Sequence, residues 1–112
     1  GAGSALAALR LAMMYDLGID VAADREAAVR WYGVAARAGE PRAMNNLAVL
    51  LLDGDAAQPV SAYAWLSIAA GRGLALAVEN RDRLAATLSE AQVGAAAALE
   101  RQWRGGGAQP KP

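Results

Sequence analysis

Residues 31–39 read WYGVAARAG and residues 65–73 read WLSIAAGRG, so one local pattern returns thirty-four residues later. Both segments place a tryptophan, two neighbouring alanines and a closing glycine at the same spacing. Upstream, residues 3–18 match residues 39–54 at an offset of thirty-six, and a third, diverging copy follows. Self-similarity at a period of about 34 residues is typical of stacked helical hairpins. The chain is therefore predicted to be an all-α repeat protein.

Each copy reads as two helices whose ends carry capping residues. An N-cap side chain accepts hydrogen bonds from first-turn N–H groups, and a left-handed glycine ends a helix. Proline suits the first turn, where a missing N–H costs nothing. We therefore expect N-caps at Ser4 and Asp24, glycine stops at Gly18 and Gly39, and first-turn prolines at Pro41 and Pro59.

The apolar residues recur at helical spacing, as Ala43, Leu47 and Leu51 do within one predicted helix. A helical hairpin cannot bury its apolar face alone, so it stacks on the next hairpin. Trp31 and Trp65 are expected to fill these alanine-lined interfaces as core residues, not to form a platform for a ligand. Truncating either is expected to destabilise the fold by about 3–5 kcal/mol.

The end of the chain departs from the repeat and is predicted to cap it. Ser89 with Gln92 forms a capping box for a last helix that runs from Glu90 to about Arg104. The apolar side of that helix carries Val93, Ala96, Leu99 and Trp103. A solenoid needs such a cap where stacking stops, so Trp103 is expected to close the core.

The composition excludes several classes of function. Eleven basic and eleven acidic residues give a net charge of zero, whereas nucleic acids and anionic membranes require clustered positive charge. Without Cys or His the chain has no disulfide, thiolate nucleophile or imidazole base. No apolar run reaches the length of a membrane span. We therefore expect no nucleic-acid partner, no direct membrane insertion and no cofactor.

The remaining polar residues do not form a catalytic or metal site in the sequence. None of the four serines begins an S-x-x-K motif, so no serine–lysine pair is available. Asp53 and Asp55 flank Gly54, which falls far short of a calcium loop and is typical of a solvated turn. We expect no catalytic residue and no metal ligand.

The repeat resembles the Sel1-like repeat family, whose members are related to tetratricopeptide repeats. The matching segments are Ala7–Leu11–Tyr15–Gly18, DREAAVRWYGVAARAG (24–39), AMNNLAVLLLDG (43–54) and AYAWLSIAAGRG (62–73). The resemblance implies a right-handed α–α superhelix of about two and a half hairpins with a C-terminal capping helix. We divide the chain into repeat 1 (4–39), repeat 2 (40–73), a degenerate third repeat with the cap (74–104) and a flexible tail (105–112).

The resemblance also implies a protein-binding surface, because the first helix of each hairpin lines the concave face of such solenoids. We expect a peptide or partner helix to bind a groove formed by Leu9, Met13, Arg42, Asn45, Val49, Leu52, Glu79 and Arg83. Asn45, Val49 and Arg83 are expected to face solvent, so that Asn45→Ala with Arg83→Ala weakens binding without much loss of stability. Asn46 is expected to bond to a neighbouring loop or backbone, and the alternative that it contacts a ligand stays open.

The most favoured function is that of an adaptor or scaffold within a longer bacterial protein, in the periplasm or the cytoplasm. One alternative is a hydrolase of cell-wall or β-lactam substrates, for which the nucleophile–base pair is missing. Another is a structural or oligomerisation spacer. The apolar side chains of Leu6, Leu9 and Met13 at the N-terminal edge predict self-association there, and the alternative that they meet an upstream repeat stays open.

A second surface differs between the two copies. Glu26, Arg30 and Arg37 on the outer face of one second helix become Val60, Ala64 and Gly71 in the next, with Ser67 opposite Gly33. Losing all charge leaves a patch of small residues that allows close approach of another helix. Two interpretations stay open: the patch docks a helix, or it has no role.

Overall fold

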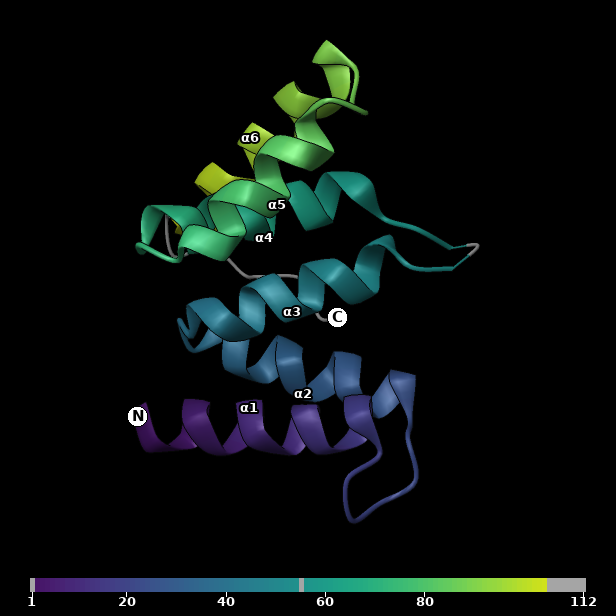
Figure 1. The fold of residues 1–112 in the computed structure, drawn as a ribbon. Coiled ribbons are helices and arrows are strands. Elements are labelled where there is room, and N and C mark those ends of the chain that lie inside the picture. Colours follow the sequence, from purple (N-terminus) through teal and green to yellow (C-terminus); the bar gives the residue numbers. More distant parts are fainter. Residues whose placement is uncertain (1, 55, 105–112) are drawn as a thin grey trace.

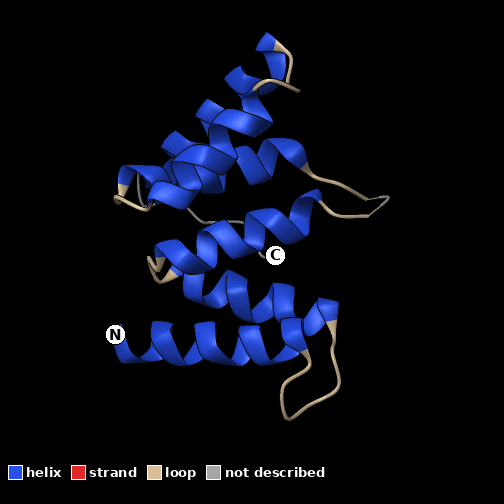
Figure 2. Cartoon of the chain, viewed as in Figure 1, coloured by secondary structure: helices blue, strands red, loops and turns tan. Residues whose placement is uncertain are grey.

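The structure is a computed structural model that describes residues 2–54 and 56–104. Over these ranges it contains six helices and no strand, which confirms the predicted all-α class (Figures 1 and 2). The helices are α1 (Ala2–Leu17), α2 (Arg25–Arg37), α3 (Pro41–Leu52), α4 (Pro59–Gly71), α5 (Ala75–Ala85) and α6 (Glu90–Arg104). The handedness, the repeat count and the division into repeats stay predictions, and the predicted tail lies outside the described residues.

The helices stack in chain order as a solenoid. α1 packs on α2 and α3 packs on α4, and these hairpins are joined because α2 also packs on α3 and α4 on α5. Figure 1 shows the resulting layers, from α1 at one end to α5 and α6 at the other. The first helices α1, α3 and α5 therefore alternate with the second helices α2, α4 and α6.

Most of the predicted helix ends are confirmed. The Asp24 carboxylate accepts a 3.1 Å hydrogen bond from the Ala27 N–H at the start of α2. Gly18 and Gly39 have φ angles of 70° and 94°, the left-handed conformation that favours glycine. The predicted N-cap at Ser4 is wrong, because α1 begins at Ala2 and Ser4 lies inside its first turn. Pro41 and Pro59 occupy the first turns of α3 and α4.

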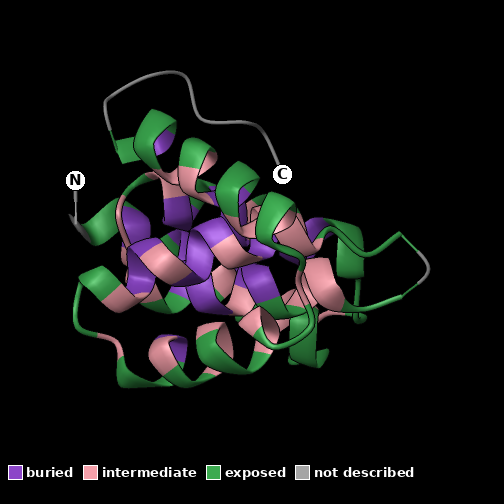
Figure 3. Ribbon diagram, turned by 90° about the horizontal axis from the view of Figure 1, so that it is seen from above, coloured by how far each residue is buried: buried purple, intermediate pink, exposed green. Residues whose placement is uncertain are grey.

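The core is built from alanines around a few large side chains and runs through the middle of the stack (Figure 3). Trp65 is buried, as predicted, and its ring stacks on that of Trp103 with centroids 4.4 Å apart. Trp31 is only partly buried and packs against the outside of the core. The prediction that both tryptophans fill interfaces as buried residues therefore holds in full only for Trp65. In α2 the fully buried aromatic side chain is the neighbouring Tyr32.

Tyr32 joins α2 to α1 through its phenol group. Its O–H donates to the Asp16 carboxylate at 2.9 Å. Burial, together with the Asp16 carboxylate, raises the pKa of the Tyr32 phenol well above its ordinary value. The side chain of Asn46 in α3 lies near enough to the phenol to lower that pKa slightly. The predicted bond of Asn46 to a loop or backbone is therefore not confirmed: its side chain lies beside the Tyr32 phenol.

The capping helix forms as predicted. The Gln92 side chain accepts from the Ser89 N–H at 2.9 Å, and the Ser89 hydroxyl accepts from the Gln92 N–H at 3.1 Å. Ala96 and Trp103 are buried along the predicted apolar side. An ion pair of 2.8 Å between Glu100 and Arg104 lies near the end of the helix.

α6 docks on the small-residue patch of α4, which answers the question left open by the sequence. Ala64 is fully buried, and the Arg104 guanidinium donates to the Ser67 carbonyl at 3.4 Å. A Cβ atom at Gly71 would lie 2.6 Å from Arg104 Nη2, so the glycine leaves room for this side chain. The patch therefore docks a helix, and that helix belongs to the same chain.

Candidate functional site

A groove of about 560 Å³ opens between the first helices α3 and α5. Its wall on α3 is apolar and its wall on α5 is mixed, while Leu66 of α4 lies beneath both. The groove is lined by Val49, Leu50, Leu52, Asp53, Leu66, Asn80, Arg83, Leu84 and Thr87. It therefore lies on the side of the solenoid from which the first helices were expected to bind a partner.

A chain of hydrogen bonds leads from the core to the α5 wall. Asn45, only 3% exposed, accepts a 2.9 Å hydrogen bond at Oδ1 from Asn80 Nδ2. Asn80 Oδ1 accepts in turn from Arg83 Nη1 at 3.5 Å. The orientation of the Asn80 amide is thus set from inside the protein, and its Oδ1 offers a long hydrogen bond to the Arg83 guanidinium at the groove.

An ion pair closes the α3 end of the groove. Arg25 at the start of α2 pairs with Asp53 at 2.8 Å. The same guanidinium binds the carbonyl of Asp53 at 2.9 Å and the carbonyl of Leu50. These carbonyls lie at the C-terminal end of α3, where a cation is favourable. Because both side chains are exposed, the pair contributes little to stability, but it neutralises the Asp53 carboxylate.

The predicted binding residues divide into three groups. Val49, Leu52 and Arg83 line the groove, and half of the Val49 surface is exposed. Leu9 and Asn45 are buried, so the expectation that Asn45 faces solvent is wrong, and Leu9 has almost no exposed surface to offer a partner. Both occupy the same place in their repeats, and Asn45 faces α5 through its bond to Asn80 rather than solvent.

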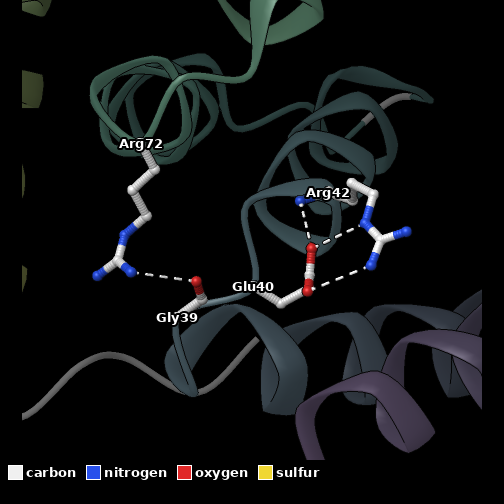
Figure 4. A network of polar contacts seen from close by, with 4 residues as sticks. All are labelled: Gly39, Glu40, Arg42 and Arg72. Carbon is white, nitrogen blue, oxygen red and sulfur yellow. Dashed lines mark hydrogen bonds and ion pairs between the residues drawn. The ribbon is translucent and has the colours of Figure 1, made fainter. Parts of the chain in front are cut away.

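The other predicted residues, Met13, Arg42 and Glu79, are exposed but do not line the groove. The Arg42 guanidinium pairs with the Glu40 carboxylate at 3.0 Å, and the backbone N–H of Arg42 also donates to that carboxylate (Figure 4). Hydrogen bonding to Arg42 lowers the pKa of Glu40. On the neighbouring loop Arg72 donates to the Gly39 carbonyl at 3.2 Å, which ties the two hairpins together (Figure 4).

The sequence reasoning missed part of the α5 wall. Asn80 and Leu84 lie at i and i+4 on one face of α5, and Thr87 follows in the turn after the helix. The expected face ran instead through Glu79 and Arg83. A shift of one residue turns a helix face by about 100°, so the periodicity of this short helix supported either choice.

The N-terminal edge is less apolar than expected because Leu9 is buried. Met13 and Leu17 are exposed on α1. Ala7 is also exposed, whereas its repeat equivalent Ala43 is fully buried in α3, which packs between α2 and α4. Self-association through this edge stays a prediction.

Nothing in the described ranges 2–54 and 56–104 gathers three or more Asp or Glu residues in an arrangement that could hold a metal ion. Asp53 pairs with Arg25, and Asp55 lies outside those ranges. None of the helices in the described part of the chain is both long and apolar enough to cross a membrane.

Comparison with known proteins identifies the repeat. The family model described as Sel1 repeat matches residues 5–40 and again residues 41–74. A search of curated proteins finds no match to the chain. The two matched segments cover more than half of the sequence and contain α2, α3 and α4 in full. The chain belongs to the Sel1 repeat family.

Proposed function

We propose that this chain is an adaptor or scaffold module that binds a peptide or helix of a partner protein in the groove between α3 and α5. Sel1 repeats are typically protein–protein interaction modules and are generally not catalytic. The observation that carries the proposal is the open groove, with an apolar floor and a half-exposed Val49 at its wall.

The chemistry of the groove suits a protein segment. Leucines and Val49 offer apolar contact area, while Asn80, Arg83 and Thr87 supply hydrogen-bonding groups along one wall. Binding sites of this kind gain affinity from apolar burial and orientation from a few polar groups. Both walls are helices packed against α4, so little ordering is needed when a partner binds.

Val49→Glu is expected to weaken binding at least tenfold, because the new carboxylate would have to lose its hydration against apolar partner side chains. Peptides selected from a displayed random library on the wild-type protein provide the probe, and fluorescence anisotropy gives their Kd. The stability of the variant should change by about 0.5 kcal/mol or less, since the site is exposed.

Val34→Glu is the matched control, because Val34 is 41% exposed within α2 and outside the groove lining. The control should bind the selected peptides as the wild type does. Peptides that bind Val49→Glu equally well would place the binding surface elsewhere. Failure to select any binder would favour the structural spacer over the interaction module.

A further inference from the structure

We propose that the groove selects a partner segment carrying an Asp or Glu side chain beside its apolar residues, and that Arg83 binds this carboxylate. The inference rests on the proposed function of the groove. It concerns the chemistry of the partner, which the repeat family does not specify.

The charges around the groove leave one cation without a counter-ion. Asp53, which also lines it, pairs with Arg25 at 2.8 Å. Across the described ranges Arg83 makes no ion pair, and its hydrogen bond goes to the neutral amide of Asn80. The net charge that the groove offers to a ligand is therefore positive.

The acidic residues next to Arg83 in α5 do not neutralise its guanidinium in the described structure. Asp82, the neighbouring residue in the chain, pairs with Arg81 at 3.2 Å. Glu79 lies one turn before Arg83 on α5 but does not reach ion-pair distance in the described structure. A carboxylate from a partner would meet an Arg83 guanidinium whose charge is not already neutralised.

The Asn45–Asn80 hydrogen bond orients the guanidinium. Asn80 uses its Nδ2 to bond the buried Asn45, which leaves its Oδ1 for Arg83 Nη1. A guanidinium has five N–H donors in a planar fork, so several remain for a ligand. The fork suits a carboxylate in a bidentate pair, and holding it in place reduces the entropy lost on binding. Asn45 and Asn80 are therefore positioning residues.

The apolar side chains that line the groove make the pairing between Arg83 and a carboxylate selective. A charge-assisted hydrogen bond strengthens when water is excluded, as it would be once apolar side chains cover Val49, Leu52 and Leu84. The groove lies open between α3 and α5, so a segment that runs through it can present a side-chain carboxylate to Arg83. The fitting partner is thus an amphipathic segment with an acidic residue next to its apolar anchors.

To test this, peptides are selected in parallel on the wild-type protein and on the Arg83→Glu variant. Each random peptide of the library is flanked on both sides by linkers, so that it offers no terminal carboxylate. Wild-type peptides whose binding is lost in Val49→Glu should be enriched in Asp or Glu at one position. Arg83→Glu should enrich Lys or Arg at that position. Its Kd for a wild-type peptide should rise at least tenfold, and changing the peptide Glu to Lys should recover most of the loss.

Arg30→Glu is the control, because Arg30 is exposed on α2, outside the groove, and the substitution changes the net charge equally. It should bind like the wild type. Asn80→Ala should reduce the preference for a Glu peptide over its Gln counterpart while changing the Kd of the Gln peptide much less. A loss that is equal for both peptides would show that Asn80 does not position Arg83.

The outcomes separate this inference from the proposed function. Groove-dependent peptides without an acidic position would overturn the carboxylate preference and leave the binding function intact. Enrichment only in a second library with free C-termini would assign the carboxylate to a chain end and overturn the side-chain source. If no peptide depends on Val49, both proposals fail together.

Discussion

Trp103→Ala is expected to lower the free energy of unfolding by about 3–5 kcal/mol, the usual loss for a buried tryptophan. Trp103 is 3% exposed, and its ring stacks on Trp65 at 4.4 Å with 29° between the planes. Removing it uncovers Trp65 and weakens the docking of α6 on the small residues of α4. Since small domains are stable by only about 5–15 kcal/mol, urea denaturation followed by circular dichroism should detect the change readily.

The loss should also be localised. α6 packs mainly on α4, so its amides should exchange hydrogen faster in Trp103→Ala than in the wild type, while those of α1 change least. Trp31→Ala is the matched control, since Trp31 is only partly buried and no described aromatic ring stacks on it. Its loss of stability should be clearly smaller. Equal losses in the two variants would refute an anchoring role for the stacked pair.

The two tryptophans show how far a repeat predicts packing. Trp31 and Trp65 occupy the same place in their copies, and the sequence therefore assigned them the same role. They differ because Trp65 lies under Trp103, a residue of the non-repeating last helix. Repeat symmetry predicts the helices and most of their ends, since these depend on local residues. It does not predict which helix covers a given position at the end of the stack.

The candidate site could also be predicted only in part, because a repeat pattern does not show which other helix covers a given residue. Position 49 and its equivalent, position 13, are both exposed, as the pattern of each helix indicated. Position 45 and its equivalent, position 9, are both buried. α3 packs between α2 and α4, so its buried arc is wider than that of a simple amphipathic helix. The hydrogen-bond partner of Asn45 is Asn80, thirty-five residues away, and no local pattern carries that information.

The structure therefore reverses the expectation that changing Asn45 would leave stability intact. Asn45→Ala is expected to destabilise the protein by about 1–3 kcal/mol, because it leaves the part-buried Asn80 amide without its acceptor and opens a small void. Arg83→Ala should stay within about 0.5 kcal/mol, since the side chain is exposed. Urea denaturation of both variants tests the contrast between two residues of one hydrogen-bonded chain.

A double-mutant cycle of Asn45→Ala with Asn80→Ala shows whether the hydrogen bond itself is the cause. If it is, the two losses should not add, and the interaction free energy should reach about 0.5–1.5 kcal/mol. Asn46→Ala is the neighbouring control, because the Asn46 side chain lies beside the Tyr32 phenol whereas Asn80 bonds Asn45, so its loss should add to that of Asn80→Ala. Additive losses for Asn45 and Asn80 would mean that burial and packing alone hold Asn45 in place. The orientation of Arg83 would then have no support from the core, because only the Asn45–Asn80 bond connects that guanidinium to a buried polar group in the described structure.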